Sequence, residues 1–275
     1  MKLLCPVCKQ DLLISEKTCS CTNGHNFDIA KEGYINLLLA NKKNSSMPGD
    51  NKLMVDAREN FLQKGFYDKL KDLLVELINK YKPLKCNILD VGCGTGYYSI
   101  NIKKTRNILD NLIGIDISKL AVKKAAKKDK SSLFITGSSF DLPIDDNSCD
   151  VIINVFSPKA NDEFKRVIKD DGILIEVMPG KDHMLELKQA MYNDVRLNRV
   201  EFEYEGFNLV ESREIKYSMS LDKEEFMNQI SMTPYFYKTN QQDMEKLDKL
   251  EQMDVTMNFI VAVWKKNNEW VFTNI

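Results

Sequence analysis

Short apolar runs alternate with amphipathic segments over most of the chain after residue 86. The runs are four to six residues long, and the segments that separate several of them place apolar residues at helical spacing. Strands that alternate with helices are typical of βαβ units, in which helices cover both faces of a parallel sheet. The pattern predicts an α/β fold with strands at Ile88–Val91, Leu112–Ile117, Leu133–Thr136, Val151–Phe156 and Ile173–Val177.

The same spacing rules predict the remaining elements. Between residues 51 and 81, apolar residues recur at helical spacing around Gly65, which predicts two helices, the second closed by Pro83. A Lys- and Ala-rich helix to about residue 128 follows the second apolar run. Beyond His183 we expect a helix to about Leu197, a strand near 207–218, a helix from Asp222 and a last strand at 257–264.

The first fifty residues have a different character from the rest. Residues 1–37 are Cys-rich and lack long apolar periodicity, while residues 38–50 are polar and contain adjacent Pro48 and Gly49. We therefore predict a small metal-binding module at 1–37, a linker or loop at 38–50 and the α/β domain at 51–275.

Composition narrows the class of protein. The 275 residues are 43% hydrophobic and 29% charged, which excludes collagen-like, coiled-coil and wholly disordered chains. Because 39 Lys and Arg nearly balance 40 Asp and Glu, any contact with nucleic acid must come from local basic surface. No apolar run approaches the roughly 18–20 residues that cross a bilayer, and no secretory signal is recognisable. We expect a soluble, cytoplasmic protein.

Four of the seven cysteines lie within the first 21 residues. Cys5 and Cys8 form a Cys-x2-Cys pair, and Cys21 and His25 form a Cys-x3-His pair, spacings that suit a tetrahedral zinc ion. Three thiolates and one imidazole leave no open position, so the zinc would be structural. Cys19 is a rival third ligand, but we favour Cys21 because its loop to His25 is short. The alternative is a group of unligated thiols near a histidine.

A glycine-rich turn follows the first apolar run. Gly92, Gly94 and Gly96 would let a nucleotide-like ligand approach the backbone at the start of a helix. Asp116 ends the second run, where a carboxylate can accept hydrogen bonds from both ribose hydroxyls. The G-x-G-x-G spacing differs from the dinucleotide fingerprint, so the ligand need not carry a pyrophosphate. A plain glycine-rich turn, the alternative, does not account for Asp90 and Asp116.

The stretch Leu89–Gly96 resembles motif I of class I S-adenosylmethionine-dependent methyltransferases, and the resemblance extends through Asp116 and Asp141–Pro143. It implies S-adenosylmethionine as cofactor and a Rossmann-like, mostly parallel seven-stranded sheet. Many of these enzymes have an Asp that contacts adenine where this chain has Gly137-Ser138-Ser139, and we interpret Asp141 as a loop-shaping residue. The cofactor contacts expected in this region are Asp90, Gly92, Gly94, Thr95, Gly96, Asp116 and Ser138.

The whole chain resembles the RlmA (also RrmA) family of 23S rRNA guanine-N1 methyltransferases, which includes a branch that confers macrolide resistance. Besides the cysteine pairs, the matching segments include Phe27–Leu38, Pro48–Asp50, Gly65–Tyr67, His183–Lys188 and Met232–Pro234. The resemblance implies a 23S rRNA hairpin as substrate and a homodimer. It also implies zinc ligands at Cys5, Cys8, Cys21 and His25, with Cys19 spare, and cofactor contacts by Tyr67, Gly92–Gly96 and His183.

Four further residues can be interpreted from their type and place. Tyr67 precedes the second predicted helix, where its ring either covers the cofactor or belongs to the core. His183 follows a turn after the fifth run, near the carboxyl edge of the sheet where ligands bind. Asn154 and Phe156 end the fourth run and are candidates to orient and stack on the guanine; the alternative is a strand end with a buried Phe. No residue is an obvious general base.

Charge does not by itself locate an RNA-binding surface. Within residues 1–44, lysines outnumber acidic residues by two, and we interpret the denser run Lys119–Lys130 as a solvated helix face. We expect the zinc module and the loop 42–50 to help grip an RNA hairpin. Two alternatives remain: a methyltransferase of a small molecule or protein with purely structural zinc, and a non-enzymatic RNA-binding protein with a vestigial cofactor fold.

Overall fold

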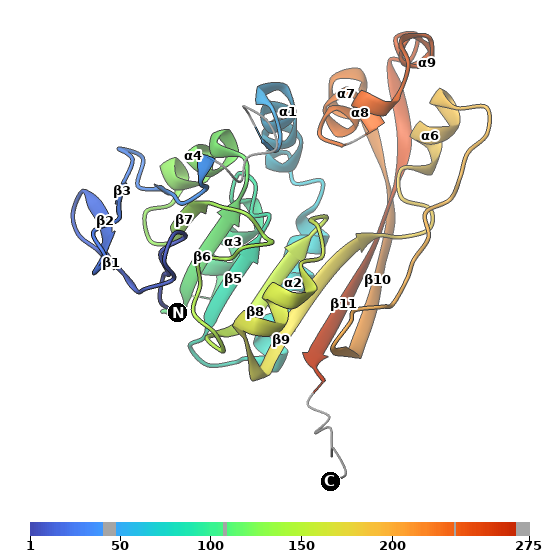
Figure 1. Ribbon diagram of the computed structural model, residues 1–275. Coiled ribbons are helices and arrows are strands. Elements are labelled where there is room, and N and C mark those ends of the chain that lie inside the picture. The colour runs from blue at the N-terminus through green and yellow to red at the C-terminus, as the bar shows by residue number, and fades with distance from the viewer. Residues whose placement is uncertain (41–47, 107–108, 234, 268–275) are drawn as a thin grey trace.

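A small antiparallel sheet forms at the N-terminus, in a computed structural model that describes residues 1–40, 48–106, 109–233 and 235–267 (Figure 1). Its strands are β1 (Leu12–Ile14), β2 (Thr18–Cys21) and β3 (Asn26–Asp28), with β2 in the middle. Residues 41–47, which make up most of the predicted linker and RNA-gripping loop, lie outside the described residues.

The large sheet has eight strands in the order β10-β11-β9-β8-β5-β6-β7-β4. All neighbours from β9 to β4 pair in parallel, whereas β11 is antiparallel to both β9 and β10. The predicted α/β class and mostly parallel sheet are confirmed, and the short strand β4, beside β7, adds an eighth strand to the seven expected. The strands are β4 (Ile35–Asn36), β5 (Asn87–Val91), β6 (Asn111–Asp116), β7 (Leu133–Thr136), β8 (Cys149–Val155), β9 (Ile168–Pro179), β10 (Phe207–Asp222) and β11 (Gln252–Lys266).

The predicted helices are present, with one difference in length described below, and the chain also has two short helices between residues 235 and 247 that the sequence does not predict. The expected pair before the first parallel strand is α1 (Lys52–Gln63) and α2 (Asp68–Tyr81). α2 stops before Pro83 because a residue that precedes proline disfavours the helical backbone. Within the described part of the chain, no helix is long and apolar enough to span a bilayer. The other helices are α3 (Tyr97–Arg106), α4 (Lys119–Lys128), α5 (Asn161–Val167), α6 (Leu185–Met191), α7 (Lys223–Ser231), α8 (Tyr235–Lys238) and α9 (Gln241–Leu247).

The helix expected to run to about Leu197 is wrong in its length, since α6 ends at Met191. Asn193 and Asp194 follow after Tyr192, and short polar side chains of this kind compete with helical hydrogen bonds. Leu197 is 44% exposed, so burial of its side chain contributes little to holding a further helical turn. Residues 192–206 instead run without helix or strand to the start of β10 (Figure 1).

Apolar side chains divide between the two faces of the large sheet. Ile88 of β5 belongs to a buried cluster with α2, α6 and α7, whereas Leu89 belongs to a second cluster on the opposite face. That second cluster also contains Leu3, Cys5 and Leu12. Because side chains alternate along a strand, one parallel strand contributes to both cores. The N-terminal module therefore shares a hydrophobic core with the large sheet.

Polar contacts also join the N-terminal module to the sheet. The Leu4 N–H donates to the Pro143 carbonyl at 2.9 Å, and the Lys9 ammonium lies 2.5 Å from the Asp141 carboxylate. In the lysine run, Lys123 pairs with Glu32 of the module at 3.2 Å. Part of this run therefore binds other parts of the chain. The division of the chain at residues 37 and 50 stays a prediction.

Candidate metal centre and cofactor site

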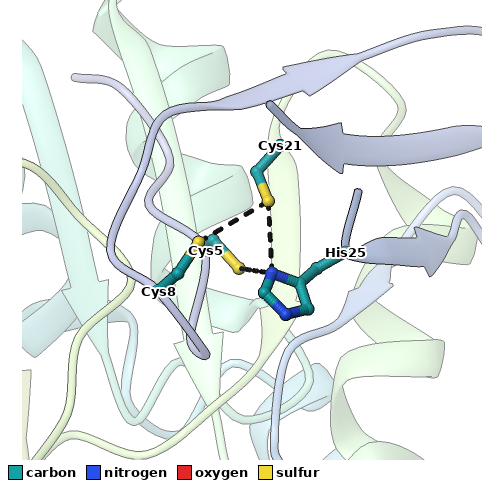
Figure 2. A group of neighbouring side chains, drawn as sticks. All are labelled: Cys5, Cys8, Cys21 and His25. Atoms are coloured by element: carbon teal, nitrogen blue, oxygen red, sulfur yellow. Dashed lines mark hydrogen bonds between the residues drawn. The ribbon is translucent and has the colours of Figure 1, made fainter. Parts of the chain in front are cut away.

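Three cysteines and one histidine converge beside the small N-terminal sheet (Figure 2). The ligand atoms of Cys5, Cys8, Cys21 and His25 all lie within 4.8 Å of one another. The Cys8 and Cys21 Sγ atoms are 3.6 Å apart. His25 Nδ1 lies 3.7 Å from Cys5 Sγ and 3.4 Å from Cys21 Sγ. Since a tetrahedral zinc ion separates sulfur and nitrogen ligands by roughly 3.5–3.8 Å, this donor set fits a closed structural zinc site.

Two left-handed turns bring the ligands together. Lys9, with φ of 59°, donates its N–H to the Cys5 carbonyl at 2.8 Å. Gly24, with φ of 81°, donates its N–H to the Cys21 carbonyl at 3.0 Å. Cys19 is fully buried on β2 and is not among the four clustered ligands. The structure thus brings Cys21, rather than its rival, into the group.

The glycine-rich turn joins β5 to α3 and is held by the neighbouring strand. Gly92 and Gly94 have φ of 81° and 53°, left-handed values that favour residues without a Cβ. At the end of β6, Asp116 accepts hydrogen bonds from the N–H groups of Gly94 at 2.9 Å and Ser118 at 2.7 Å. A carboxylate has about four acceptor sites, so Asp116 keeps capacity for two ribose hydroxyls. The turn and this carboxylate therefore fit an adenosyl ligand.

Asp90 and Thr95 are buried supports of this turn. Asp90 is 1% exposed and accepts a hydrogen bond from the Ser99 hydroxyl of α3. Burial raises the pKa of Asp90 to about 7. The Thr95 side chain is buried, and its carbonyl accepts a hydrogen bond from the Lys128 ammonium of α4 at 3.2 Å. These contacts anchor the turn to two helices; direct contact with the cofactor by either residue, or by Gly96, stays a prediction.

Four aromatic rings from distant segments meet at the carboxyl edge of the sheet. The rings of Tyr67 and Phe259 have centroids 4.8 Å apart, and those of Phe259 and His183 are 4.9 Å apart. Phe156 stacks on His183 at 6.1 Å with an interplanar angle of 22°. The structure thus brings Tyr67, Phe156 and His183 together around Phe259, a residue that the sequence analysis missed.

Phe156 combines exposure with a strained backbone. It is 46% exposed and has φ of 52°, so the alternative interpretation as a buried strand-end Phe is wrong. Its neighbour Ser157 packs on the glycine turn, because a Cβ on Gly92 would lie 2.6 Å from the Ser157 Cβ. Asn154 is buried and donates its amide to the Pro158 carbonyl at 3.0 Å. Asn154 therefore holds the loop that presents Phe156.

The His183 ring is buried, and one hydrogen bond sets which of its nitrogens carries the proton. The Asn258 N–H donates to His183 Nδ1 at 3.3 Å, so the proton resides on Nε2. Burial, followed by the nearby ammonium of Lys188, lowers the pKa of His183 to about 3. The ring is therefore neutral at pH 7, a hydrogen-bond donor through Nε2 and a poor proton acceptor.

This depressed pKa predicts a pH-dependent stability. An unfolded histidine binds a proton below about pH 6.5, whereas folded His183 does not until about pH 3. The unfolded state thus binds more protons between these values, and the folded state loses stability as the pH falls. At pH 5 the loss from this group amounts to about 2 kcal/mol.

We expect His183→Gln to remove this loss. The difference in free energy of unfolding between pH 7 and pH 5, measured by urea denaturation, should be about 2 kcal/mol smaller in the variant. The substitution leaves His25, the other histidine of the chain, unchanged. An identical pH dependence in the two proteins would show that His183 is protonated while folded.

Ser138 and Arg58 complete the surroundings of the turn. Ser138 follows β7, and its hydroxyl accepts a hydrogen bond from the Phe140 N–H at 3.2 Å. Contact between Ser138 and adenine stays a prediction. Arg58 of α1 pairs with Asp50 and donates to the Met232 carbonyl at 2.8 Å. A Cβ on Gly94 would lie 3.9 Å from the Arg58 Cδ. The sequence does not predict a role for Arg58 at this turn, because no local spacing links the two.

Known proteins are similar to this chain over both the zinc-binding region and the methyltransferase domain. Residues 3–46 match the family described as "RlmA, N-terminal", and residues 84–232 match a family described as "Methyltransferase domain". Over 276 residues the chain is 30% identical to "Putative 23S rRNA (guanine-N(1)-)-methyltransferase YxjB" of Bacillus subtilis, which covers 95% of this chain and 96% of the relative. It is 27% identical to "23S rRNA (guanine(748)-N(1))-methyltransferase" of Streptomyces fradiae, covering 94% and 96%. The crystal structure of MccD protein superposes with a TM-score of 0.47 at 22% identity, covering 70% and 96%.

The protein is thus an S-adenosylmethionine-dependent methyltransferase with a Cys3His zinc ribbon ahead of its methyltransferase domain. It belongs to the RlmA family, and the two relatives that match almost the whole chain are named as 23S rRNA guanine-N1 methyltransferases, the first of them as putative. The resemblance in the sequence is therefore confirmed, together with S-adenosylmethionine and zinc as cofactors.

Proposed function

We propose that the chain transfers the methyl group of S-adenosylmethionine to N1 of a guanine in a 23S rRNA hairpin. The observation that carries this proposal is the exposed ring of Phe156, whose neighbour in sequence, Ser157, packs on the glycine turn. An exposed aromatic ring at this position suits an extruded base, since single bases stack on aromatic side chains. The names of the two relatives that match almost the whole chain support guanine N1 as the acceptor atom.

The residues around the turn have distinct roles in this proposal. Asp116 accepts hydrogen bonds from the ribose hydroxyls, and Arg58 ties α1 to Asp50 and to the Met232 carbonyl beside the turn. Bound S-adenosylmethionine supplies an electrophilic methyl carbon. Displacement at this carbon is in line, so the main task of the chain is to align the acceptor nitrogen, through Phe156 and the loop that Asn154 holds. The N1 proton leaves to solvent, because neutral His183 is a poor base.

The zinc ribbon is proposed to contact the same RNA. Its fold shares a core with the sheet, so the ribbon holds a fixed position relative to the methyltransferase domain. The homodimer, the macrolide resistance and the contribution of Tyr67 to cofactor binding stay predictions.

Primer extension on 23S rRNA tests the proposal. Methylation at N1 blocks base pairing, so rRNA treated with the protein and donor should give a reverse-transcription stop that untreated rRNA lacks. Phe156→Ala should lower kcat/KM for rRNA roughly tenfold to a hundredfold, as expected for one lost stacking contact of about 1–3 kcal/mol. Its affinity for S-adenosylmethionine should stay unchanged.

Phe156→Tyr is the matched control, because it keeps a ring at the same place and should retain nearly full activity. Absence of the stop, with methylation of a protein or small molecule instead, would refute the RNA substrate. Equal kcat/KM for wild type and Phe156→Ala would refute the stacking role.

A further inference from the structure

A surface cavity of about 440 Å³ lies between α6, the irregular segment that follows it and α8. It occupies the side of the molecule opposite the zinc ribbon (Figure 1). Its ionisable lining has three cations against one carboxylate, which gives it a net positive charge. The residues that matter for ligand binding are Lys188, Tyr192, Arg196, Asn198, Arg199 and Tyr235.

Lys188 is an unusual lysine because it is only 3% exposed. Its ammonium donates to the Asn198 side-chain oxygen at 2.9 Å and lies 5.4 Å from the centre of the Tyr235 ring. Among the described residues, no carboxylate lies within 4.0 Å of it, and burial lowers its pKa. A buried charge is costly unless it is paired, so a ligand with negative charge would compensate this ammonium.

The cavity is connected to the proposed reaction site through Asn198. The Asn198 backbone N–H donates to the Lys181 carbonyl at 3.2 Å, and its side-chain amide donates to the Gly180 carbonyl at 2.8 Å. The same Gly180 carbonyl accepts the N–H of His183 at 3.2 Å. One residue therefore links the cation of the cavity to the turn that positions His183 beside Phe156.

We propose that this cavity is a phosphate subsite that holds a backbone phosphate of the RNA next to the target guanine. Lys188 supplies the buried cation, Arg196 and Arg199 supply exposed ones, and the rings of Tyr192 and Tyr235 form apolar walls for the adjoining nucleotide. This inference rests on the proposed RNA substrate. Phosphate contacts of this kind position RNA without reading its sequence.

The exposed arginines give the first test, because their replacement leaves the core intact. Fluorescence anisotropy would measure the affinity of the full-length protein for a 23S rRNA fragment at several salt concentrations. We expect Arg196→Gln/Arg199→Gln to weaken binding about tenfold and to reduce the salt slope by about one, the effect of one lost phosphate contact. Lys85→Gln/Lys104→Gln replaces two exposed lysines outside the cavity, so it removes the same charge and should bind as wild type does.

Lys188→Met gives the second test, since it removes the charge and keeps the length of the side chain. If Lys188 had a purely structural role, the variant would be less stable than wild type. If Lys188 binds a ligand, the variant should have a Tm at least as high as that of wild type and an RNA affinity about tenfold weaker.

The outcomes separate the two proposals. Unchanged RNA affinity and salt slope in the arginine variant overturn the phosphate subsite, as does a failure of the wild-type protein to bind RNA. Binding of RNA without methylation overturns the proposed function alone. If the arginine variant bound a protein substrate more weakly than wild type and bound RNA equally well, the cavity would belong to that protein partner. This result would also overturn the phosphate subsite.

Discussion

Cys21→Ser is expected to abolish zinc binding and to unfold the N-terminal ribbon. Serine is a poor zinc ligand, and structural zinc in small modules contributes on the order of 10 kcal/mol to folding. Zinc content measured by atomic absorption should fall from one ion per chain to nearly none. Hydrogen exchange should show loss of protection for the backbone amides of β1, β2 and β3.

The effect should extend beyond the ribbon. Lys9 and Leu4 hold the loop around Asp141 and Pro143, on the side of the cofactor site where adenine is expected. Loss of the ribbon fold should therefore also weaken the binding of S-adenosylmethionine, measured by calorimetry. A variant that keeps full donor affinity after losing its zinc would show that the two sites are independent.

Cys19→Ala is the matched control for the metal site. Cys19 lies two residues from Cys21 on the same strand and is fully buried, but it is outside the ligand group. The variant should lose a little stability through a small cavity and still bind one zinc ion. Loss of zinc from Cys19→Ala together with its retention in Cys21→Ser would assign the third thiolate to Cys19.

The parallel strands could be predicted from the sequence because each is buried on both faces. Ile88–Val91 and Val151–Val155 are apolar at almost every position, and this texture does not depend on which strand lies next to which. By contrast, β4 has two residues and no periodicity, and it forms because the chain from the zinc ribbon passes the open edge of β7. The end of α6 combines a local signal, the polar Asn193 and Asp194, with the exposure of Leu197, which only the fold shows.

The candidate sites divide in the same way. The zinc ligands and the glycine turn are built from residues that are close in sequence, so their spacing carries the chemistry. The aromatic group is not local, since Tyr67, Phe156, His183 and Phe259 come from four segments up to 192 residues apart. In the sequence, Phe259 is one of several apolar residues in the last strand, and nothing in the pattern distinguishes it from the core. The contact of Arg58 with the turn likewise required the fold.

Asp116→Asn should abolish most of the affinity for S-adenosylmethionine while leaving the fold intact. In the wild-type protein both carboxylate oxygens accept backbone N–H groups, from Gly94 and Ser118. In asparagine an NH2 group replaces one carboxylate oxygen. This group donates hydrogen bonds and cannot accept them, so it would face one of these backbone N–H groups and one ribose hydroxyl without bonding to either as an acceptor. An unsatisfied buried group costs about 1–3 kcal/mol, and the lost ribose contact adds to it, so the Kd should rise about a hundredfold. Isothermal titration calorimetry measures this change directly.

Asp129→Asn is a suitable control because Asp129 also accepts a backbone N–H, from Ser131 at 2.8 Å, but lies at the far end of α4. It should bind the donor with wild-type affinity. A second measurement uses the raised pKa of buried Asp116. The ribose hydroxyls donate to the charged form of the carboxylate, so donor affinity should decrease as the pH falls through this pKa in wild type and not in Asp116→Asn. The same acid dependence in both proteins would show that another group binds the ribose, and Asp116 would then serve only to hold the turn.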